Sequence, residues 1–111
     1  MERGIVGKLQ EEETRIDEAI VNELVKLTPQ WWRAASLDVT YSTESGVEKY
    51  AHVISSLEGH KEAVFPSDKL YAETHALGLL FRRHGQQWKR ARYEIRLQDD
   101  GSWKYTVDFA Y

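Results

Sequence analysis

Residues 91–111, which read ARYEIRLQDDGSWKYTVDFAY, alternate between apolar and polar side chains on both sides of a turn. A β-strand places successive side chains on opposite faces, so residues 91–97 and 103–111 each predict a strand with one buried face. The Asp-Asp-Gly sequence at residues 99–101 is a strong signal for a tight hairpin turn. This stretch therefore predicts an antiparallel sheet with one face in the core and the other in water.

A second hairpin is predicted earlier in the chain. Residues 35–42 alternate in the same way, residues 43–46 form a turn that ends in glycine, and residues 47–55 are predicted to be the returning strand. Which face of this returning strand is buried is ambiguous, because both of its faces carry polar and apolar residues.

Two helices are predicted from apolar residues at helical spacing. The first spans about residues 14–27 and ends before Pro29, because the residue before a proline is pushed out of the helical conformation. The second begins at Ser67, a good N-cap, and ends near Gly85. The apolar stripe of the first helix consists of Ile16, Ile20, Leu24 and Leu27.

The predicted order is α-β-β-α-β-β, which indicates an α+β fold with both helices on one face of a four-stranded antiparallel sheet. One domain is expected over residues 1–111, with residues 1–13 as either a flexible or a helical N-terminal extension. The expected core contains Ile20, Leu24, Val39, Leu77, Phe81, Ile95, Val107 and Phe109.

Composition limits the classes of function. The 111 residues contain no cysteine, which excludes disulfides, thiolate zinc sites and cysteine nucleophiles. The N-terminus has no apolar run typical of a signal peptide, so a cytoplasmic location is expected. The net charge is −3, and residues 1–60 carry six Lys and Arg against eleven Asp and Glu. An acidic chain is a poor candidate for non-specific nucleic-acid binding and a better one for binding a basic partner.

No catalytic, metal or cofactor motif is evident, so we expect neither an enzyme nor a cofactor. The four histidines lack the i, i+4 helical spacing that lets two imidazoles share a zinc ion. Glu11–Glu13 and Asp99–Asp100 are interpreted as a solvated helix start and a turn. The histidines are His52, His60, His75 and His84.

Arginines on one predicted strand offer an alternative function. Arg90, Arg92 and Arg96 fall on the polar face of residues 90–97 and could form a nucleic-acid-binding surface. Such surfaces also use exposed aromatic residues for base stacking, whereas Tyr93 and Tyr105 have the opposite parity. A charged strand face balanced by neighbouring carboxylates is the simpler interpretation.

Two adjacent tryptophans, Trp31 and Trp32, follow Pro29. Adjacent tryptophans in an irregular segment are difficult to bury together. We expect one to fill the seam between the first helix and the sheet and the other to be partly exposed, where it could anchor a partner. The alternative, in which the pair serves only the core, is the simpler interpretation.

In the order and spacing of these features the chain resembles the YezG-like family of bacterial immunity proteins. The resemblance covers roughly residues 14–111 and excludes residues 48–66, which match poorly. Its elements are Leu27-Thr28-Pro29-Gln30-Trp31, the strand ending at Tyr41, Leu80-Phe81-Arg82-Arg83-His84-Gly85, Trp88, and residues 100–111.

The resemblance implies a non-enzymatic function, in which the chain binds a cognate secreted toxin domain, often a nuclease, and blocks it. It supplies no catalytic residue. Nuclease surfaces are basic because they hold phosphates, and an acidic partner associates with them quickly.

Strand parity suggests a surface for such a partner. Asp38 lies on the polar side of the first predicted strand, and Glu48 and Tyr50 share a face of the second. We expect these three residues to form an acidic patch with Tyr50 as its aromatic centre. If Tyr50 instead belongs to the core, the partner site is expected at Trp31 or Trp32.

Overall fold

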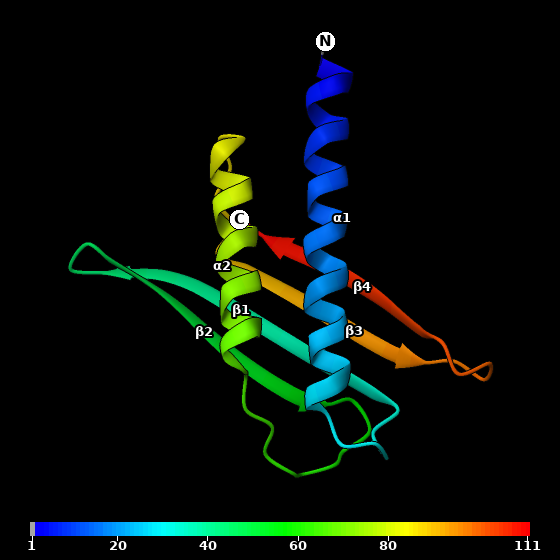
Figure 1. The fold of residues 1–111 in the computed structure, drawn as a ribbon. Coiled ribbons are helices and arrows are strands. Elements are labelled where there is room, and N and C mark those ends of the chain that lie inside the picture. The colour runs from blue at the N-terminus through cyan, green and yellow to red at the C-terminus, as the bar shows by residue number, and fades with distance from the viewer. Residues whose placement is uncertain (1) are drawn as a thin grey trace.

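The computed structural model describes residues 2–111, with side chains described from residue 9 onward. Both helices cover one face of the four-stranded antiparallel sheet, whose strand order is β2-β1-β3-β4 (Figure 1). The predicted α+β class and element order are confirmed. The elements are α1 (Glu2–Leu27), β1 (Ala34–Glu44), β2 (Val47–Ser56), α2 (Asp68–Arg83), β3 (Arg90–Leu97) and β4 (Trp103–Ala110).

Helix α1 begins twelve residues earlier than the predicted span of 14–27. Residues 2–13 of the predicted extension are therefore helical, whereas Met1 lies outside the described residues. Residues 8–13 are lysine, leucine, glutamine and three glutamates, all strong helix formers, so the helix has no local reason to stop at residue 14. Its N-terminal turns project beyond the sheet, past β4 (Figure 1).

The first hairpin turns more tightly than the sequence indicated. Its loop consists of Ser45 and Gly46 alone, and both have positive φ, 53° and 79°. Two consecutive residues with positive φ are typical of a type I′ turn, whose twist matches that of the flanking strands. This two-residue loop pairs Glu44 with Val47 and so fixes the register of the whole hairpin.

The ends of α2 follow the prediction. The Ser67 side chain accepts a hydrogen bond from the Leu70 amide at 3.1 Å, which is the N-cap arrangement. The helix ends at Arg83, and Gly85 then takes a positive φ of 75°, which is readily adopted only by glycine.

The core lies between the two helices and the sheet. Six of the eight expected core residues are buried there: Ile20, Leu24, Val39, Leu77, Phe81 and Ile95. The other two, Val107 and Phe109, are only partly buried. Both belong to β4, which is an edge strand and is less fully covered by the helices than the central strands.

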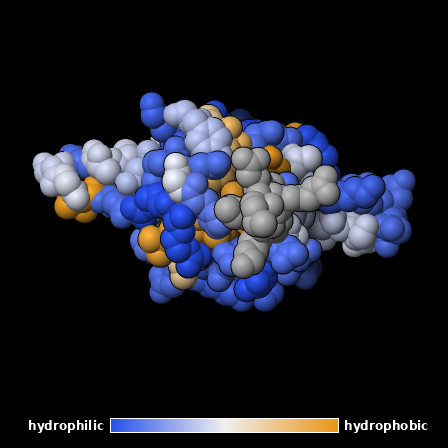
Figure 2. Space-filling view, turned by 90° about the horizontal axis from the view of Figure 1, so that it is seen from above, coloured by the Kyte–Doolittle hydropathy of each residue, from blue (hydrophilic) through white to orange (hydrophobic). Residues whose placement is uncertain are grey.

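Neither helix of the described residues combines the length and apolar character that a bilayer-spanning helix needs. Viewed from above, from the end where α1 projects, most of the visible surface is hydrophilic, with hydrophobic patches between (Figure 2).

Candidate functional site

Trp31 and Trp32 lie in the turn that follows α1 and have opposite environments. Trp32 is 1% exposed and belongs to the core, whereas Trp31 is 60% exposed. The Trp32 amide donates a hydrogen bond to the Pro29 carbonyl at 3.0 Å, which closes the turn. One tryptophan is thus buried and the other exposed, and the simpler interpretation, in which both serve only the core, is wrong for Trp31.

A single carboxylate from a distant loop binds both indoles. Trp31 donates its Nε1–H to Glu62 Oε2 at 2.7 Å, and Trp32 donates to Oε1 of the same carboxylate at 3.3 Å. The Glu62 backbone amide and the two indole donors stabilise the charged carboxylate, so the pKa of Glu62 is lowered. The exposed Trp31 ring is therefore held in place, which reduces the entropy it would lose on binding a partner.

The loop that carries Glu62 is itself ordered by hydrogen bonds. Ser56 Oγ accepts from the amides of Glu58 and His60, at 3.0 Å and 3.2 Å. Glu58 accepts from the Arg33 amide at 2.7 Å, and the His60 ring stacks on Trp32 with centroids 5.9 Å apart. We call Trp31, Trp32, Glu58, His60 and Glu62 together the Trp31 site.

The first hairpin does not form the expected acidic patch. Asp38 pairs with Val53, while Tyr50 pairs with Tyr41, so Tyr50 and Asp38 lie on opposite faces of the sheet. Glu48 shares the helix-covered face with Tyr50, as expected of those two, but Asp38 lies on the open face. The prediction of one patch is wrong, because the hairpin pairs even-numbered residues of β1 with odd-numbered residues of β2, and the expected four-residue turn would have done the same.

Tyr50 is partly buried and packs between the sheet and α2. Its ring contacts those of Tyr41, His75 and Trp88, with centroids 5.2, 5.6 and 6.0 Å apart. Burial raises the pKa of its hydroxyl. Glu48, beside it, forms an ion pair with Arg82 of α2 at 2.6 Å. Because Tyr50 is part of the packing, the prediction that remains is the alternative one, a partner site at Trp31 or Trp32.

On the open face, Asp38 belongs to a network with the arginines of β3. It accepts from Arg90 Nε at 2.9 Å and from Arg92 at 2.7 Å. Glu94 continues the network by accepting from Arg92 at 3.0 Å and from Arg96 at 3.1 Å. These hydrogen bonds raise the pKa of Arg92 and lower that of Glu94. The three arginines are thus balanced by two carboxylates.

Asp17 is a buried carboxyl group of α1 that lies outside the apolar stripe predicted for this helix. It is 3% exposed, and the Tyr93 hydroxyl of β3 donates a hydrogen bond to it. Burial, together with the neighbouring Glu13, raises the pKa of Asp17 to about 8. Its position three residues before Ile20 and seven before Leu24 was the signal for burial, since this spacing puts all three on one helix face.

Three of the four histidines, His52, His60 and His75, contact neighbouring side chains. His52 Nε2 lies 2.8 Å from Thr74 Oγ1, and burial lowers the pKa of this imidazole. Among residues 9–111, whose side chains the structure describes, no three His, Cys, Asp or Glu side chains gather in a way that could hold a metal ion. Neither a protein-family model nor a curated protein sequence matches this chain.

Proposed function

We propose that this chain is a protein-binding domain that uses the Trp31 site to recognise its partner. The observation that carries the proposal is Trp31 itself, a large aromatic side chain that is 60% exposed yet fixed by a 2.7 Å hydrogen bond. Tryptophans of this kind are enriched among the few residues that supply most of the energy of a protein interface. The buried Trp32 donates to the same Glu62 carboxylate as Trp31 and stacks on His60.

The proposed partner is a cognate secreted toxin domain of the nuclease class, which the chain neutralises as an immunity protein. The resemblance to the YezG-like family supplies this class of partner. The net charge of −3 and the carboxylates Glu58 and Glu62 near Trp31 suit a partner whose phosphate-binding surface is basic. Such a protein would act in the cytoplasm, without catalysis or a cofactor, by covering the toxin's active surface.

The alternative, nucleic-acid binding by Arg90, Arg92 and Arg96, has less support. These arginines already donate to Asp38 and Glu94, and phosphate groups would have to replace those bonds. Tyr93, the aromatic residue between them, is fully buried and unavailable for stacking.

The proposal is tested by co-expression with the toxin domain encoded beside this chain's gene. We expect the toxin alone to stop growth, the chain to restore it, and the two proteins to co-purify as a stable complex. Growth arrest that persists despite folded, abundant chain, with no complex recovered, would refute the assignment.

A further inference from the structure

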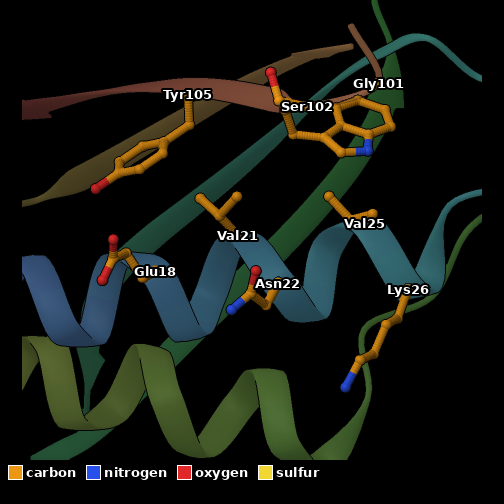
Figure 3. Close-up of a pocket in the computed structure, with 9 residues that line it drawn as sticks. Glu18, Val21, Asn22, Val25, Lys26, Gly101, Ser102 and Tyr105 are labelled. Carbon is orange, nitrogen blue, oxygen red and sulfur yellow. The ribbon is translucent and has the colours of Figure 1, made fainter. Parts of the chain in front are cut away.

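The apolar side of β4 is incompletely covered by the side chains that the structure describes. A hollow of about 700 Å³ lies between α1 and β4, lined on the helix by Val21 and Val25 and on the strand side by Trp103 and Tyr105 (Figure 3). All four residues of β4 that face the helices are only partly buried. They are Trp103, Tyr105, Val107 and Phe109.

β4 is also an open edge of the sheet. It pairs with β3 on one side, and among residues 2–111 no strand pairs with its other side. Unpaired strand edges are sites at which another chain can add, and natural proteins usually protect them. Helix α1 crosses this edge, and its N-terminal turns stand beyond it with no other described element beneath them (Figure 1). A further strand added to the free edge of β4 would therefore lie next to these N-terminal turns of α1.

We propose that this edge pairs with β4 of a second copy of the same chain. The two strands run antiparallel about a two-fold axis at Thr106, which joins the two sheets into one of eight strands. The overhanging turns of each α1 then lie over the partner's sheet, and the half-covered side of β4 lies within the interface. The proposal goes beyond the function proposed above and does not depend on it.

The charges of β4 select this register. Opposed residues of an antiparallel pair share a face, and Lys104 and Asp108 both lie on the open face, two residues on either side of Thr106. Pairing about Thr106 therefore sets Lys104 opposite the partner's Asp108, twice in the dimer. On the other face it sets Trp103 opposite the partner's Phe109 and Tyr105 opposite the partner's Val107, which are favourable cross-strand pairs. No ion pair among the described residues uses Lys104 or Asp108.

The other edge strand, β2, lacks this complementarity. Its charged residues, Glu48 and Lys49, are consecutive and therefore lie on opposite faces. They can never stand opposite each other in an antiparallel pairing of β2 with itself. In addition, Glu48 is already bound to Arg82. The choice of β4 over β2 thus follows from the spacing of opposite charges along each strand.

The chain contains no cysteine, so a single introduced thiol reports the pairing directly. In the proposed register the two copies of residue 106 face each other at roughly 4.5–5.5 Å between Cα atoms, which is within reach of a disulfide. Thr106→Cys should therefore form a covalent dimer under mild oxidation. Ala51→Cys is the matched control, since Ala51 is also exposed on the open face of an edge strand. The control should remain monomeric.

A charge exchange tests the register without a crosslink. Lys104→Asp places like charges opposite each other twice and should raise the dimer dissociation constant roughly tenfold, as measured by sedimentation. Lys104→Asp combined with Asp108→Lys restores both pairs and should restore the dimer. Circular dichroism confirms that each variant is folded.

The proposal is overturned if the wild-type chain stays monomeric up to its solubility limit and the Thr106→Cys variant forms no crosslink. The free edge of β4 would then be a candidate site for a different protein. A dimer that is indifferent to the charge exchange also overturns it. Neither outcome bears on toxin binding at Trp31, which is measured with the toxin domain.

Discussion

The hydroxyl oxygen of Tyr50 lies so close to Gly78 of α2 that a Cβ atom at residue 78 would clash with it. Only glycine leaves room for this contact. It lets α2 settle on β2 with the Tyr50 ring beneath it, and it explains why Tyr50 is part of the packing between helix and sheet.

Gly78→Ala should therefore destabilise the fold, although alanine is by about 1 kcal/mol the better helix former. We expect a net loss of roughly 1–3 kcal/mol in the free energy of unfolding, measured in urea, because the added methyl group forces Tyr50 to move. Tyr50→Phe in the same chain removes the clashing oxygen and should recover part of the loss. A Gly78→Ala variant as stable as wild type would show that α2 packs less closely.

Two phenylalanines in contact should differ in their contribution to stability. Phe81 and Phe109 have ring centroids 4.8 Å apart, but Phe81 is buried while Phe109, on the edge strand, is only partly so. Phe81→Ala should cost roughly 3–5 kcal/mol and Phe109→Ala clearly less. An equal or larger loss at Phe109 in urea unfolding would contradict the assignment of β4 as a half-covered edge.

Asp17 should make stability depend on pH. Its pKa is raised to about 8 in the folded chain, from an ordinary value of 3.8. Between these values the folded chain keeps a proton that the unfolded chain has released, so stability falls as pH rises through this window. Asp17→Asn removes the titration and keeps an oxygen that can accept from Tyr93. Urea unfolding at a series of pH values should give a flatter profile for the variant, whereas parallel profiles would show that Asp17 ionises normally.

The arginine network predicts weak binding to nucleic acid. Arg90, Arg92 and Arg96 are balanced by Asp38 and Glu94, and the chain is acidic overall. At physiological salt we expect fluorescence anisotropy to show no RNA or DNA binding tighter than non-specific levels. Submicromolar binding that disappears on replacing Arg92 and Arg96 would favour the alternative function.

The spacing of apolar residues predicted the elements and most of the core, because Ile20 and Leu77 lie in segments with a clear helical period and Ile95 lies in one with the alternation of a strand. The register of the first hairpin was not predicted, since it depends on a loop of two residues, Ser45 and Gly46, rather than four. Loops of two and of four residues both pair even-numbered residues of β1 with odd-numbered residues of β2, so the opposite faces of Asp38 and Tyr50 could have been predicted with either loop.

The exposure of one of the two tryptophans could be predicted from the sequence, but its contact with Glu62 could not. Adjacent tryptophans after a helix end imply that one is exposed, and the sequence did not say which. The role of Glu62 depends on a loop that returns to Trp31 from thirty-one residues further along the chain, a contact made only by the tertiary fold.

The most direct test of the account is the kinetics of binding between the chain and its toxin domain after Trp31→Ala. Tyr111→Ala is the control, because Tyr111 is an aromatic residue with the same 60% exposure outside the Trp31 site. If Trp31 is the anchor, its loss should speed dissociation by roughly 30-fold or more, while the control dissociates like wild type. A folded Trp31→Ala variant that binds the toxin as tightly as wild type would contradict the central claim.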